Sequence, residues 1–113
     1  MRLPAEALLL RIFIGESDRR DGRPLHEVIV EEARRRGMAG ATVLRGFLGF
    51  GANSRLHTSK VLRLSEDLPI VVEIVDQEDG IEAFLPELDT MISEGLVTLE
   101  KVRVIVYRHN SSR

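Results

Sequence analysis

Residues 37–51 read GMAGATVLRGFLGFG, and this segment changes character twice along its length. Gly37 is a typical residue to end a helix. Residues 40–48 then have the apolar, partly β-branched composition of a strand. From Arg45 onward, glycines alternate with phenylalanines after this single arginine. The segment therefore predicts the end of a helix, a strand, and a stretch of backbone that a ligand or partner can approach closely.

A polar run, residues 52–60, follows these glycines. It holds two basic side chains, a histidine and four side chains with an amide or hydroxyl group. Such a concentration of polar groups after a strand predicts a long functional loop. The sequence thus favours a regulatory or ligand-sensing module over an enzyme.

Composition narrows the class of protein. The 113 residues are expected to form a single domain, 1–113, long enough for an ordinary core. The formal net charge of −2 argues against a nucleic-acid binder, because such proteins need a basic face. The chain has no cysteine, so disulfides and thiolate chemistry are excluded and we predict a cytoplasmic protein. Motifs for an activated serine, a zinc protease or a phosphate-binding loop are missing, so no enzyme, catalytic residue or metal site is predicted.

Hydrophobic periodicity gives the order of the elements. Strands are predicted at residues 8–14, 40–48, 70–76 and 96–107, and helices from Pro24 to about Arg36 and from Asp79 to Gly95. Pro24 suits a first helical position, and Asp79 with Glu82 has the spacing of a capping box. The order βαββαβ with right-handed connections predicts a ferredoxin-like α+β sandwich, an antiparallel sheet with two helices on one face.

The predicted strands are largely apolar on both faces of this sheet. In residues 70–76 each of the two alternating sets is mostly Ile or Val. The strands of an antiparallel sheet with one solvent-exposed face should alternate apolar and polar residues. Because these strands do not, another chain is expected to cover the second face. Arg11 and Glu73 lie in strands that are neighbours in the expected order, and we predict that they form an ion pair.

Several segments in combination resemble one family. They are RIFIGE (11–16), AGATVLRG (39–46), GFG (49–51), LPIVVEIVD (68–76), FLP (84–86) and EGLVT (94–98). On these segments the chain resembles the uncharacterised family DUF190, which is similar to the PII-like superfamily. The resemblance implies a homotrimer of ferredoxin-like subunits. It also implies that residues 50–60 form a signalling loop that reports a bound ligand, and it makes a fluoride-exporting membrane transporter a candidate partner.

The root of this loop is the predicted ligand site. The predicted ligand-binding residues are Arg45, Gly46, Gly49, Gly51, Arg55, His57 and Lys60. They combine permissive backbone with cationic donors at an expected subunit boundary, so a small anionic ligand is predicted, with an adenine nucleotide as one candidate. Residues 92–101 contain one glycine and one lysine, so they lack the glycine-rich basic loop that nucleotide-binding PII proteins carry at this junction.

Other interpretations of the same residues stay open. The glycines would also relieve crowding where strands from neighbouring subunits meet. A lone His57 is a poor metal site, but a threefold axis would bring three copies together, so a CutA-like protein that binds divalent cations is an alternative. A structural accessory of a membrane transporter is another.

Two further clusters have simple structural explanations. The three arginines within residues 19–23 could bind phosphate, but they also fit a solvated loop. Asp76, Glu78 and Asp79 could hold magnesium, but a capping role for Asp79 explains them without a metal.

Overall fold

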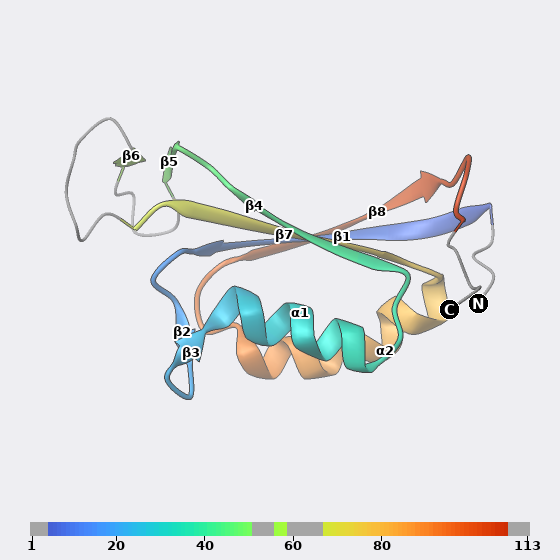
Figure 1. Ribbon diagram of the computed structural model, residues 1–113, viewed down its shortest axis with the longest axis horizontal. Helices are drawn as coiled ribbons and strands as arrows, with labels where there is room; N and C mark the ends of the chain where they lie inside the picture. Colours follow the sequence, from blue (N-terminus) through green and yellow to red (C-terminus); the bar gives the residue numbers. More distant parts are fainter. Residues whose placement is uncertain (1–4, 51–55, 59–66, 109–113) are drawn as a thin grey trace.

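The structure, a computed structural model, describes residues 5–50, 56–58 and 67–108. Its elements are β1 (Glu6–Gly15), β2 (Arg19–Arg20), β3 (Arg23–Pro24), α1 (Leu25–Arg35), β4 (Gly40–Arg45), β5 (Leu48–Phe50), β6 (Leu56–Thr58), β7 (Pro69–Asp76), α2 (Glu78–Met91) and β8 (Leu96–Arg103). The main sheet is antiparallel throughout, in the order β4-β7-β1-β8. Both helices lie on one side of it (Figure 1). The predicted ferredoxin-like α+β sandwich is confirmed.

The apolar core lies between the sheet and the two helices. Strands β1 and β7 supply alternate side chains, and each helix supplies one stripe. The buried members are Leu8, Leu10, Ile12, Ile14, Leu25, Ile29, Ala33, Ile70, Val72, Ile74, Ile81, Phe84, Leu88 and Met91. Asp76 is also buried, and its carboxylate accepts a hydrogen bond from the Ala39 N–H at 3.2 Å. This bond ties the α1–β4 connection to the end of β7.

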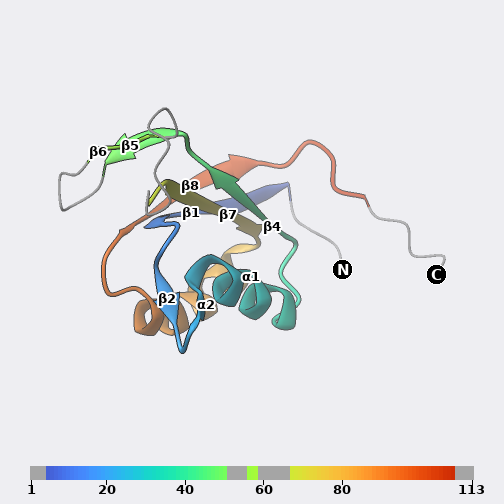
Figure 2. The same cartoon turned by 60° about the vertical axis from the view of Figure 1, so that its left-hand side comes forward.

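The other face of the sheet carries neither helix, and in Figure 2 the β5–β6 ribbon lies on that side at one end of the sheet. One row across it consists of Leu44, Val71, Phe13 and Leu96. Of these, Leu44 is 48% exposed and Leu96 is 58% exposed. The second face is therefore largely apolar and is not covered by the residues that the structure describes.

A charged group lies in the middle of this open face. Arg11 is opposite Glu73 in the register of β1 and β7, and Arg11 Nε donates to Glu73 Oε2 at 2.9 Å. The same guanidinium also binds Glu100 on β8. Hydrogen bonding to Glu73 raises the pKa of Arg11. The predicted pair of Arg11 and Glu73 is confirmed.

The helix starts differ from the prediction. Pro24 is not helical: it precedes α1 with φ −54° and ψ 129° and pairs with Arg19 in the small β2–β3 ribbon. Helix α2 begins at Glu78 and has no side-chain cap, so the capping box expected from Asp79 is wrong. A Cβ atom at Gly80 would lie 1.9 Å from Asp76 Oδ2. The Asp76 carboxylate therefore lies against the first turn of α2.

The strand ends also differ. The strand predicted over residues 40–48 is interrupted after Arg45, and β5 pairs with β6 in a separate ribbon at one end of the sheet (Figure 1). Helix α2 ends at Met91, before Gly95, and β8 ends at Arg103 rather than at residue 107. The interruption after Arg45 creates the candidate site.

Candidate functional site

The chain leaves the main sheet at Gly46, where β4 gives way to the β5–β6 ribbon. The Gly46 N–H donates to the Pro69 carbonyl at 2.8 Å. A Cβ atom at Gly46 would lie 2.9 Å from Pro69 Cγ, and one at Gly49 would lie 3.1 Å from the same atom. Both glycines thus let the backbone pack against the Pro69 ring, where a side chain would be crowded. At these two positions the crowding arises within one chain, against Pro69.

Arg45 holds an intramolecular carboxylate at this exit from the sheet. Its Nε lies 2.9 Å from Glu16 Oε2, and its Nη2 donates to Glu16 Oε1 at 3.3 Å. Two nitrogens of one guanidinium thus meet two oxygens of one carboxylate, the usual geometry for binding a planar anion. The Arg45 side chain is 60% exposed, so the pair contributes little to stability. The Arg45 guanidinium is therefore exposed to solvent and is paired with the Glu16 carboxylate of the same chain.

Residues 67 and 68 hold the Glu16 backbone in place. The Glu16 N–H donates to the Leu68 carbonyl at 2.8 Å. The next N–H, that of Ser17, donates to Asp67 Oδ1 at 2.7 Å. The start of the β1–β2 connection is therefore fixed to the residues that lead into β7. Both Glu16 and Asp67 are absent from the predicted site.

The predicted ligand-binding residues are only partly brought together. Arg45, Gly46 and Gly49 gather at the end of β4, and the backbone of His57 lies opposite Gly49 in the β5–β6 ribbon. The others lie outside the described residues: Gly51, Arg55 and Lys60. The cationic donor that the structure describes at the site is Arg45.

Two of the three arginines of the first connection, Arg20 and Arg23, have side-chain partners within the chain. Arg20 Nη1 donates to the Thr90 carbonyl at 2.8 Å, and Arg23 Nη2 lies 2.5 Å from Glu31 Oε2. Hydrogen bonding to Arg23 lowers the pKa of Glu31, and the same bond raises the pKa of Arg23. These contacts support a structural role for both arginines.

Metal ligands do not gather in the part of the chain that the structure describes. There, no group of three His, Cys, Asp or Glu side chains could hold a metal ion. Asp76 is engaged with Ala39, as described above. The described residues therefore give the magnesium interpretation no support.

Two solved structures that share this architecture are PII-like proteins. A putative PII-like signalling protein from Thermus thermophilus aligns with a TM-score of 0.64 at 20% identity, over 89% of this chain and 91% of its own. CPII from Thiomonas intermedia, a nitrogen regulatory PII-like protein solved bound to ADP, AMP and bicarbonate, aligns with a TM-score of 0.59 at 19% identity, over 88% of both chains. At these identities the likeness establishes the fold, and the chain has the PII-like form of the ferredoxin-like fold.

Sequence relatives place the chain in a family. Residues 7–104 match the family DUF190, described as an uncharacterized ACR. A UPF0166 protein of Aquifex aeolicus is 42% identical over 97 residues, covering 86% of this chain and 91% of that protein. A UPF0166 protein of Methanocaldococcus jannaschii is 33% identical over 100 residues, covering 88% and 92%. The chain belongs to the DUF190 family. Among the described residues, no helix is long and apolar enough to cross a membrane.

Proposed function

We propose that this protein is a PII-like regulatory homotrimer that senses a small anionic ligand at the root of its 50–60 loop. In this proposal it is not an enzyme, since its role is to bind the ligand and present the loop to a partner. The ligand class is a nucleotide or bicarbonate-like anion, the kind of ligand with which the CPII structure was solved.

The observation that carries the proposal is the bidentate pair of Arg45 and Glu16. An exposed guanidinium that holds a carboxylate at two nitrogens has the geometry to hold a carboxylate, bicarbonate or phosphate group of a ligand. Glu16 lies just after the end of β1, outside the strands of the main sheet. A ligand anion can therefore take the place of Glu16 without a rearrangement of the main sheet.

Assembly follows from the open face of the sheet. No described residue covers its apolar row or its central Arg11, and contiguous apolar surface of this kind marks an interface. Three copies facing one another across a threefold axis would cover all three sheets. The ends of β4 would then lie near subunit boundaries, where a bound anion can influence more than one copy.

Isothermal titration calorimetry tests the ligand directly, with ADP, AMP and sodium bicarbonate as titrants. We expect saturable binding of at least one of them to the wild-type protein. Arg45→Ala should weaken that binding by about 1.5–3 kcal/mol, the usual size of a hydrogen bond to a charged group. Arg19→Ala, which removes another exposed arginine, is the matched control and should leave the affinity unchanged.

Glu16→Gln tests the competition between ligand and carboxylate. Removing the internal anion should strengthen ligand binding by up to about five-fold, because an exposed ion pair contributes at most about 1 kcal/mol. If none of the three titrants binds, the proposed ligand class is wrong. If one binds with the same affinity to Arg45→Ala and the wild type, the site lies elsewhere.

A further inference from the structure

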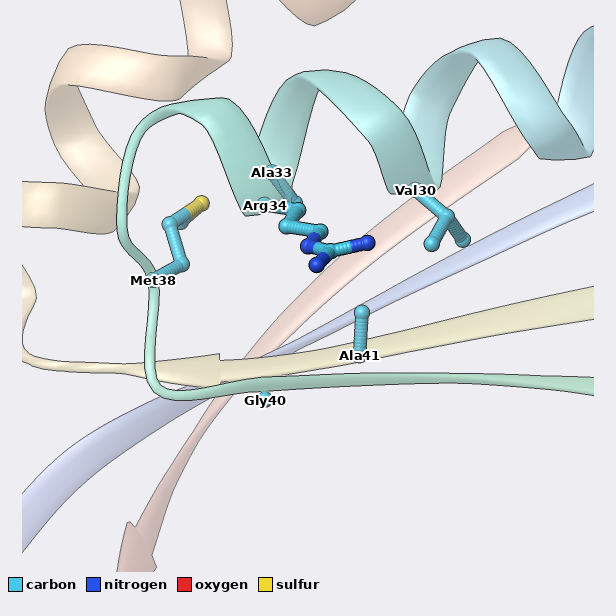
Figure 3. Close-up of a pocket in the computed structure, with 6 residues that line it drawn as sticks. All are labelled: Val30, Ala33, Arg34, Met38, Gly40 and Ala41. Carbon is cyan, nitrogen blue, oxygen red and sulfur yellow. The ribbon is translucent and has the colours of Figure 1, made fainter. Parts of the chain in front are cut away.

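The three consecutive arginines that end α1 make different contacts. Arg35 and Arg36 both bind the carboxylate of Glu32, and Arg36 also lies 5.6 Å from the centre of the Phe84 ring. The Arg34 side chain, in contrast, makes no hydrogen bond or ion pair with any residue that the structure describes. Its side chain lies in the space between α1 and β4 (Figure 3). The guanidinium is therefore available to a ligand in that space.

The space beside Arg34 is a pocket of about 240 Å³. Apart from the guanidinium, its lining is formed by Val30, Ala33, Met38, Gly40 and Ala41. The Ala41 side chain points from the strand toward the helix, across from Val30 (Figure 3). An apolar cavity of about 150 Å³ accommodates a benzene molecule. The pocket thus has room for an aromatic ring or a short branched chain together with one charged group.

Backbone hydrogen bonds hold the wall of this pocket in place. The Met38 N–H donates to the Ala33 carbonyl at 3.1 Å, and the Ala39 N–H donates to the buried carboxylate of Asp76 at 3.2 Å. The Tyr107 hydroxyl donates to the Ala39 carbonyl at 3.1 Å. The connection between α1 and β4 is therefore fixed at consecutive residues. A pocket with a fixed wall does not have to be ordered by the ligand, which lowers the cost of binding.

The charge at this end of α1 favours an anion. Arg34 and Arg35 in the last turn, Arg36 at the C-cap and the single Glu32 carboxylate leave an excess of two positive charges at the end of the helix. This excess outweighs the partial negative charge of a helix C-terminus, which is roughly half a unit. Farther along the space between α1 and β4, Glu27 and Glu31 line a neighbouring pocket with Val43. Their carboxylates would repel an anion. The position of the anion is thus set at Arg34.

We propose that the pocket between α1 and β4 is a second binding site, one that takes a small carboxylate with a compact apolar body. The carboxylate binds Arg34, and the apolar body lies between Met38 and Ala41. One guanidinium matches the single charge of a monocarboxylate, and its planar fork matches the two oxygens. The site is separate from the one at Arg45, which lies at the opposite end of β4.

Benzoate and its neutral isostere benzamide are the probes. In an NMR titration of the labelled full-length protein, we expect benzoate to cause saturable shifts of the Met38 methyl and the Ala41 amide signals. Benzamide should bind more weakly, because it fills the same volume without the charge. Arg34→Gln should weaken benzoate binding about ten-fold or more, the fold-change of a lost hydrogen bond to a charged group. It should leave benzamide binding unchanged.

Two further variants make the result specific. Arg35→Gln removes the neighbouring arginine and should leave benzoate binding within about two-fold of the wild type, since that side chain pairs with Glu32. Ala41→Leu fills the pocket and should abolish binding of both probes. It should not change the oligomeric mass of the protein in solution. The proposal is overturned if benzoate moves neither signal, if Arg35→Gln and Arg34→Gln lose equal affinity, or if benzamide binds as well as benzoate. A changed mass for Ala41→Leu would also overturn it, because the groove would then hold a second copy of the chain.

Discussion

The two faces of the main sheet differ in what covers them, although both are largely apolar. On one face, Val72 and Ile74 are fully buried under α1 and α2. On the other face, Phe13 and Leu44 stay 37% and 48% exposed, around the charged group of Arg11. An apolar strand face has to be covered by other protein surface. The pattern of the strand does not tell whether that surface belongs to the same chain or to another copy.

The largest effect is expected for Val72→Asp, on the covered face. Val72 has no exposed surface, so an aspartate there would be a buried carboxylate without a partner. Such a change should cost more than about 4 kcal/mol, a large part of the total stability of a small domain. We expect loss of the folded state by circular dichroism. A cooperative melt close to that of the wild type would contradict the placement of the core.

Val71→Asp, one residue away, should act on assembly instead of on folding. Val71 belongs to the apolar row of the open face, between Leu44 and Phe13 in the register. A carboxylate there stays hydrated in a single chain but not between copies. We expect a folded protein with reduced mass by light scattering. Unfolding equal to that of Val72→Asp would mean that the two faces do not differ as described.

Arg11→Leu should have a smaller effect on the same face. It removes the partner of Glu73 and Glu100 and leaves two carboxylates at the proposed interface. We expect dissociation at higher protein concentration than for the wild type, measured by sedimentation over a dilution series. The double variant Arg11→Leu/Glu73→Leu should recover part of the assembly. Equal dissociation of the single and double variants would show that the pairing itself does not matter.

The smallest effect concerns Glu32, on the helix side. Hydrogen bonding to Arg35 lowers the pKa of Glu32, partly opposed by desolvation and assisted by Arg36. A carboxyl with a lowered pKa stabilises the fold above its ordinary value of 4.5, and this stabilisation is lost as the pH falls through the folded pKa. We expect Glu32→Gln to lower the melting temperature slightly at neutral pH. The difference from the wild type should shrink in acid, and a constant difference would argue against the assigned cause.

Much of the fold could be predicted from the sequence because the strands and helices carry clear periodicity. The pairing of Arg11 with Glu73 was also predictable, since it follows from strand order alone. Boundaries were harder to predict. Pro24 satisfies both a helix start and the end of a short ribbon, and only its tertiary contacts decide between them.

The candidate site was predictable in place but not in its contacts. The glycines and Arg45 mark the exit from the sheet, yet nothing in residues 40–51 points to the ring of Pro69 that Gly46 and Gly49 pack against. Glu16 lies 29 positions before Arg45. Their contact depends on how the β1–β2 connection is fixed to residues 67 and 68, which is a tertiary property. The role proposed for Arg34 could not be predicted from the sequence either. Arg35 and Arg36 are the same residue type and differ from Arg34 in their contacts.

Light scattering of the wild-type protein at micromolar concentration tests the central claim, that copies of this chain cover the open face. We predict a stable particle of three times the chain mass of 12.7 kDa. A stable monomer at that concentration would contradict it, because the apolar face would then be exposed to water without a cover.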